Sequence, residues 1–156
     1  MSVKVSWYDE ESQILHYRFD GAWTWDEYYA VLPLGREMMK EVQHMVCILN
    51  DMRNTDIVPT AFLDAAQSVI STTPPNTGLV VFVSTNYVFQ TVFRAFVRIY
   101  PHLTQLYRLE SDLYEAVRKQ REWLKANGHA QDFLPPRQYP SDKGERNPSD
   151  TDSDPE

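Results

Sequence analysis

The sequence predicts an α/β fold in which a mixed β-sheet packs against about four helices. Two continuous apolar runs, 44–51 and 79–84, are typical of strands buried on both faces. A helical segment lies between them, which indicates a parallel β-α-β crossover. Two short β-rich runs, 3–9 and 14–21, are separated by so few residues that an antiparallel hairpin is favoured at the N-terminal end. The predicted order of elements is β-β-α-β-α-β-α-β-α.

The first long helix is predicted over 24–42. Thr24 followed by Glu27 has the spacing of a capping box, in which each side chain satisfies a free backbone N–H. Pro33 lies inside the segment, and we expect a kink or break there because proline removes a backbone hydrogen bond. Apolar residues recur at helical spacing and predict the buried stripe of this helix: Trp25, Tyr28, Leu32, Met39 and Val42.

The remaining elements follow from runs of apolar residues between loop-forming segments. Ser111 is expected to cap the last helix, since serine accepts hydrogen bonds from free N–H groups at a helix start. Thr60 has the same position before an earlier helix. The predicted helices are 61–71, 86–100 and 111–128, and a short strand is predicted at 105–110.

The composition describes a globular domain followed by a segment of another kind. The chain has 156 residues, and its net charge of −7 argues against a surface that binds nucleic acid. Residues 1–128 are predicted to form a single domain. Residues 129–156, rich in Pro, Ser, Asp and Gly, are predicted to be a disordered acidic tail. Because no apolar run is long enough for an integral membrane segment and no signal core is present, we expect a cytoplasmic location.

The sequence lacks motifs that are typical of catalysis or cofactor binding. None of the four histidines lies at metal-ligand spacing from another His, Cys or acid, and the five glycines form no phosphate-binding loop. We therefore predict neither a metal site nor a cofactor. Asp51 and Asp56 bracket a loop after the central strand, but a general base there needs an acid–base partner that the sequence does not display. The protein is accordingly predicted not to be an enzyme.

Three stretches together resemble a known family. They are VCILNDMRNTDIVPTAFL (46–63), YRFDGAWTWDEY (17–28) and LYRLESDLYEAV (106–117). Their order and spacing, over about residues 3–125, are similar to the STAS fold of the anti-sigma-factor antagonists, and more closely to the SpoIIAA-like (STAS/SEC14-type) proteins. The resemblance implies a STAS-like fold and a non-enzymatic regulatory role, in which the domain docks an unidentified protein partner.

The resemblance also implies a site after the central strand. In STAS antagonists this strand ends in an aspartate, and a Ser or Thr before the next helix is phosphorylated to control docking. Asp51 matches the aspartate and Thr60 falls at the hydroxyl position, while Pro59 and Ala61 depart from the family pattern. Thr60 could equally serve as a helix cap. The predicted partner-binding residues, with Thr60 as the phosphorylation site, are Asp51, Arg53, Asp56 and Thr60.

The alternative function is the binding of a small apolar ligand. Aromatic residues are dense near the hairpin and the first helix, and aromatic walls suit apolar pockets. The predicted pocket residues are Trp23, Trp25 and Tyr28. A docking domain predicts an exposed apolar patch beside helix 61–71, whereas a ligand-binding protein predicts an enclosed apolar cavity. The sequence leaves a homodimer open in either case.

Overall fold

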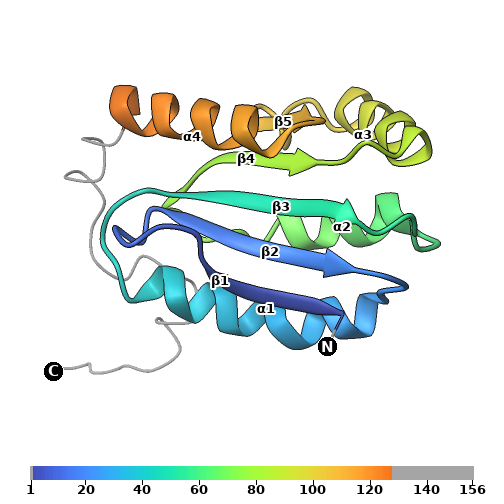
Figure 1. Ribbon diagram of the computed structural model, residues 1–156, viewed down its shortest axis with the longest axis horizontal. Helices are drawn as coiled ribbons and strands as arrows, with labels where there is room; N and C mark the ends of the chain where they lie inside the picture. Colours follow the sequence, from blue (N-terminus) through green and yellow to red (C-terminus); the bar gives the residue numbers. More distant parts are fainter. Residues whose placement is uncertain (1, 128–156) are drawn as a thin grey trace, which may run out of the picture.

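The computed structural model describes residues 2–127, which form a mixed β-sheet with helices on both faces (Figure 1). The strands are β1 (Val3–Trp7), β2 (Ile14–Asp20), β3 (Val46–Asn54), β4 (Thr77–Val83) and β5 (Tyr107–Glu110). The helices are α1 (Trp25–Lys40), α2 (Phe62–Ile70), α3 (Tyr87–Ile99) and α4 (Leu113–Asn127). The predicted tail, 129–156, lies outside the described residues.

The five strands lie in the order β1-β2-β3-β4-β5. β1 pairs with β2 in an antiparallel hairpin, and the other neighbours are parallel. β3 is therefore the central strand. The predicted fold class is confirmed: an α/β fold with an N-terminal hairpin, parallel β-α-β units and four helices.

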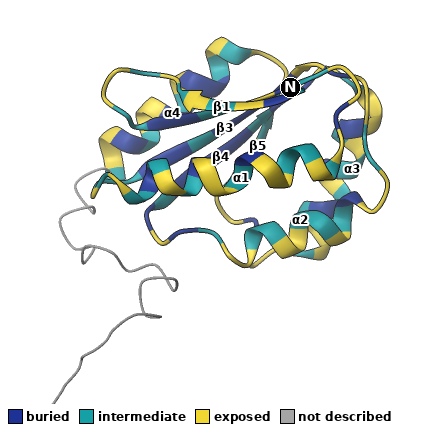
Figure 2. Ribbon diagram, turned by 90° about the horizontal axis from the view of Figure 1, so that it is seen from below, coloured by how far each residue is buried: buried dark blue, intermediate teal, exposed yellow. Residues whose placement is uncertain are grey.

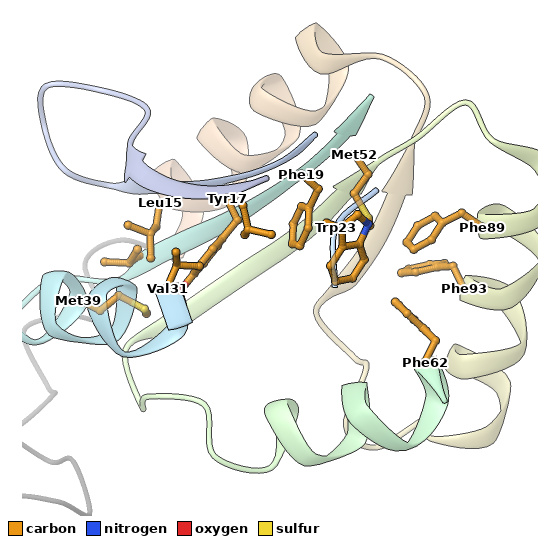
Figure 3. Close-up of a cluster of buried hydrophobic side chains, with 12 residues drawn as sticks. Leu15, Tyr17, Phe19, Trp23, Val31, Met39, Met52, Phe62, Phe89 and Phe93 are labelled. Carbon is orange, nitrogen blue, oxygen red and sulfur yellow. The ribbon is translucent and has the colours of Figure 1, made fainter. Parts of the chain in front are cut away.

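The sheet separates two hydrophobic cores. On one face, alternate residues of β2 such as Tyr17 and Phe19 pack with residues of α1, α2 and α3 (Figure 3). On the other face, Cys47, Leu49 and Val81 pack against α4. Figure 2 looks onto α1, α2 and α3, whose outer surfaces are exposed. Since side chains alternate along a strand, the apolar residues of β3 are divided between the two cores.

Helix α1 begins with the predicted capping box. The Glu27 amide donates to Thr24 Oγ1 at 3.2 Å, and the Thr24 amide donates to Glu27 Oε1 at 3.0 Å. The sequence predicts a kink or break at Pro33, but α1 continues through it as one helix from residue 25 to 40. Pro33 and Tyr29, whose carbonyl loses its partner, are both exposed, so water can satisfy that carbonyl.

Three local predictions around loops are wrong. β3 extends to Asn54, so the first part of the predicted loop after residue 51 is strand. Thr60 does not cap α2: the N-cap is Ala61, in the left-handed conformation with φ 59° and no side-chain hydrogen bond. At α4 the cap is Asp112 in place of Ser111, since its carboxylate accepts from the amides of residues 114 and 115, both at 3.4 Å. Within residues 2–127, no helix has both the length and the apolar character that a membrane span needs.

Candidate functional site

The two predicted sets of site residues lie on opposite faces of the sheet. Asp51 and Arg53 alternate with Met52 along β3 and share the α4 face with Leu49. Met52 belongs to the core on the other face, together with Trp23. The domain therefore offers two separate sites, an ion-pair cluster under α4 and an aromatic region under α1, α2 and α3.

The ion-pair cluster is built on the buried carboxylate of Asp51, which is 3% exposed. Arg53 donates from Nε to Oδ1 at 2.8 Å and from Nη2 to Oδ2 at 2.8 Å. His16 of β2 reaches the same carboxylate, with Nε2 at 3.0 Å from Oδ2. Because an ionised carboxylate only accepts, His16 Nε2 is the donor. The His16 ring also packs edge-on against Tyr8.

The surroundings of Asp51 favour its ionised form. Burial raises the pKa of the Asp51 carboxyl, but hydrogen bonds from Arg53 and His16 outweigh this effect and hold the pKa well below its usual range. A general base works best with a pKa near the operating pH. The cluster is therefore suited to holding the end of β3 in place, and poorly suited to accepting a proton.

The other two predicted partner-binding residues take no part in this cluster. Asp56 is exposed and forms no hydrogen bond or ion pair with another described residue. Thr60 is also exposed, and its carbonyl oxygen accepts from Trp25 Nε1 at 3.0 Å. Immediately before Asp56, buried Thr55 anchors the segment by donating from Oγ1 to the Gly21 carbonyl at 2.5 Å. Sequence reasoning passed over Thr55.

The aromatic region lines a partly open cavity of about 80 Å³ between the sheet and helices α1, α2 and α3. A water needs ~10–15 Å³ of such volume, so the cavity has room for roughly five to eight waters or a small ligand. The three predicted pocket residues all line it. Trp23 packs edge-on against Trp25, with ring centres 5.1 Å apart, and Tyr28 lies 6.1 Å from Trp25. Figure 3 shows Trp23 beside Phe19, opposite Phe62 and Phe93.

Five polar groups in the cavity wall lack a hydrogen-bond partner among residues 2–127. Trp23 Nε1 is buried and unpartnered. The Asn50 amide also forms no hydrogen bond with a described residue, and neither do three tyrosine hydroxyls: Tyr17, Tyr28 and Tyr107. Buried polar groups in proteins are nearly always hydrogen-bonded to protein or water. Their grouping around one cavity marks it as a place where solvent or a ligand completes the hydrogen bonding.

Arg36 of α1 supplies the charged group in the cavity wall. Its Nη2 donates to the Val69 carbonyl near the end of α2, at 3.1 Å. It forms no ion pair with any carboxylate in the part of the chain that the structure describes. This bond and the one from Trp25 to Thr60 connect α1 to the two ends of α2, so α2 is fastened over the cavity at both ends.

The cavity keeps its tyrosine hydroxyls protonated at neutral pH. Burial raises the pKa of Tyr17 to about 12, although the charge of Arg36 opposes the shift. Burial also raises the pKa of Tyr107 and, well above its usual value, that of Tyr28, again against the charge of Arg36. Three hydroxyl donors and one cation therefore surround the same space.

Sequence reasoning found the aromatic wall but missed its polar groups, Arg36, Asn50 and Tyr107. A signal for Arg36 was present, because it lies four residues after Leu32 on the predicted apolar stripe of the first helix. A cation at that spacing points into the same layer as the aromatic residues. Within residues 2–127, no group of three His, Cys, Asp or Glu side chains is placed to hold a metal ion.

Comparison of the chain with protein-family models, curated proteins and solved structures found no match. The function is therefore inferred from the geometry of the cavity and of the ion-pair cluster.

Proposed function

We propose that this protein is a binding domain of STAS-like, SpoIIAA-like type that holds a small apolar molecule in the cavity under α1 and α2. The STAS-like assignment is supported by the strand order and by a central strand that carries Asp51 near its end. The single observation that carries the binding function is the cavity itself. It is lined by aromatic rings, among them Trp23 and Trp25, and by polar groups without protein partners. Ligand sites are typically of this kind, mostly apolar with a few placed polar groups.

Neighbouring alanines of α2 allow a matched test. Ala66 lines the cavity, whereas Ala65 does not. Ala66→Phe fills the space that the ligand needs, and Ala65→Phe adds the same side chain elsewhere on the helix. We expect 1-octanol, an apolar probe of suitable size, to bind wild type and Ala65→Phe saturably and Ala66→Phe at least about tenfold more weakly.

Titration calorimetry measures the affinity, and tryptophan emission reports on Trp23 and Trp25 in the wall. Melting curves establish that each variant is folded before binding is compared. Equal binding by the two variants would place the ligand elsewhere. No saturable binding of 1-octanol to the wild type would remove the basis of the proposed function.

A second candidate is docking of a protein partner at the edge where β3 and β4 end. Within the described chain, helix α2 itself exposes none of its large apolar side chains. The edge nearby favours this candidate, since Tyr87 is 76% exposed, Val88 is 59% exposed and Ile57 is 41% exposed. A lysate pull-down with Tyr87→Ser tests it. Tyr114→Ser, at the start of α4 and 71% exposed, is the control that should retain the partner.

A further inference from the structure

Arg36 has no counter-charge among the described residues and lies in a largely apolar wall. The guanidinium has five N–H donors, and among residues 2–127 its hydrogen bonding is limited to the Val69 carbonyl. The side chain is half-buried and shares the cavity with Ile48, Val80 and Phe82. A charge in apolar surroundings is costly unless an opposite charge or hydrogen-bond acceptors accompany it. An anion bound in the cavity would therefore stabilise the Arg36 guanidinium.

The polar groups near Arg36 are chiefly donors. Tyr17, Tyr28 and Tyr107 line the same cavity as Arg36, and the Arg36 charge lowers the pKa of each hydroxyl against the effect of burial. Each is protonated and without a partner in the described chain, so each can donate a hydrogen bond. Trp23 Nε1, which can only donate, is buried without a partner in the same wall. A ligand that satisfies this set must present oxygen acceptors.

The charge of the cavity wall indicates which kind of anion the cavity can bind. Within residues 2–127, the cavity wall holds one cation, and the tyrosines are neutral. A carboxylate carries a single negative charge, and its two oxygens match the paired N–H groups of an arginine. A phosphate monoester carries nearly two charges at neutral pH and would remain partly unbalanced.

From these observations we propose that the ligand is a small amphipathic carboxylic acid whose carboxylate binds Arg36 and the tyrosine hydroxyls, with its apolar part among the aromatic rings of α1, α2 and α3. This inference rests on the proposed function, because it assigns a chemical class to the ligand of the same cavity. The apolar part faces Trp25, Phe62 and Phe93. The same wall therefore supplies both hydrogen-bond donors and apolar ring surface.

Octanoate and 1-octanol have the same chain length and differ in the head group, so together they test the inference. We expect octanoate to bind wild type more tightly than 1-octanol. Arg36→Met should weaken octanoate about tenfold or more, because hydrogen bonds to a charged group are lost, and leave 1-octanol within about threefold. Arg94→Met removes the same charge from an exposed position on α3 and should change neither affinity.

Tyr107→Phe is a second variant that deletes only a hydroxyl and keeps the ring in place. It should weaken octanoate about fivefold, as expected for one hydrogen bond, without changing 1-octanol. It keeps the inference testable if Arg36→Met does not fold. The expected pH profile differs too, since octanoate binding falls when acid protonates the ligand and 1-octanol binding does not.

Failure of this inference can be told apart from failure of the proposed function. If 1-octanol binds and octanoate binds no better, the carboxylate assignment is overturned and the cavity remains a binding site. If Arg36→Met weakens both probes equally, Arg36 acts by holding α2 through Val69, which also overturns the assignment. If neither probe binds wild type, the proposed function fails together with the inference.

Discussion

The hydroxyl of Tyr17 lies directly against Gly35 of α1, in the space that a Cβ at position 35 would occupy. The absence of a side chain at Gly35 therefore allows the phenol of Tyr17 to pass close to the helix and reach the region of Arg36. A glycine inside a helix usually costs about 1 kcal/mol relative to alanine. At position 35 the helix bears this cost, and the missing side chain permits the close approach of β2 and α1.

The first prediction concerns Gly35→Ala. The added methyl group displaces Tyr17, and overpacking of this kind costs about 1–3 kcal/mol, which outweighs the gain in helix propensity. Urea unfolding should show a net loss of about 1 kcal/mol or more in the free energy of unfolding. Adding Tyr17→Phe should recover part of the loss, because the closest atom is removed. A Gly35→Ala protein as stable as wild type would contradict the contact.

A second prediction concerns Asp51 and its two donors. Asp51→Asn cannot accept from both His16 and Arg53 as the carboxylate does, so the free energy of unfolding at pH 7 should fall by about 1–3 kcal/mol. Asp56→Asn is the matched control. Because Asp56 is exposed and unpaired within the described chain, its replacement should change the free energy by less than about 0.5 kcal/mol.

The same substitution should alter the dependence of stability on pH. The pKa of Asp51 is lower in the folded state than its unfolded value of about 3.9, so the stabilisation is fully present above that pH. It is lost as the pH falls below about 4 toward the folded-state pKa. Urea titrations from pH 7 to pH 3 should therefore show a steeper loss for wild type than for Asp51→Asn. Parallel curves would mean that the ion pair contributes nothing.

The sequence can reveal those features of the site that depend on neighbouring residues in the chain. It cannot reveal those that depend on how distant segments pack together. The run 44–51 predicts a strand buried on both faces because its residues 45–49 are all apolar, and the structure places Cys47 and Ile48 in contact with opposite cores. The link between His16 and Asp51 is of another kind. It depends on the β2–β3 register, in which Arg18 lies opposite Asp51. That register cannot be inferred from the spacing of residues along the chain.

The start of α2 was mispredicted for a tertiary reason. Thr60 has a residue type and position that are typical of a cap, but its carbonyl is held by Trp25 and the chain then turns through Ala61 with a positive φ. The helix begins one residue later than the cap rule requires. Arg36 was overlooked because a cation interrupting an apolar stripe is usually interpreted as a surface residue, whereas in the structure it lines the cavity.

A third prediction follows from the conformation of Ala61. A residue other than glycine in the left-handed region is strained by about 1 kcal/mol or more, and glycine adopts this region freely. Ala61→Gly should therefore raise the free energy of unfolding by about 0.5–1 kcal/mol. Ala65→Gly, in the interior of α2, should lower it by about 1 kcal/mol. Differential scanning calorimetry of the two variants gives the sign of each change in the free energy of unfolding. A decrease in both variants would show that Ala61 is not strained.

The last prediction concerns the hold of α1 on α2. Trp25 Nε1 donates to the Thr60 carbonyl just before α2, and Trp25→Phe removes that donor while keeping an aromatic ring in the wall. Loss of one hydrogen bond of about 1 kcal/mol should let the N-terminal half of α2 open more often. Amide hydrogen exchange should accelerate about fivefold in α2 and remain unchanged in α4, which packs on the other face. Trp7→Phe, in β1 and outside the cavity wall, is the control.

If α2 is the part of the wall that moves to admit a ligand, 1-octanol should also dissociate faster from Trp25→Phe in stopped-flow experiments. Unchanged exchange in α2 would mean that packing by Phe62 alone holds the helix over the cavity.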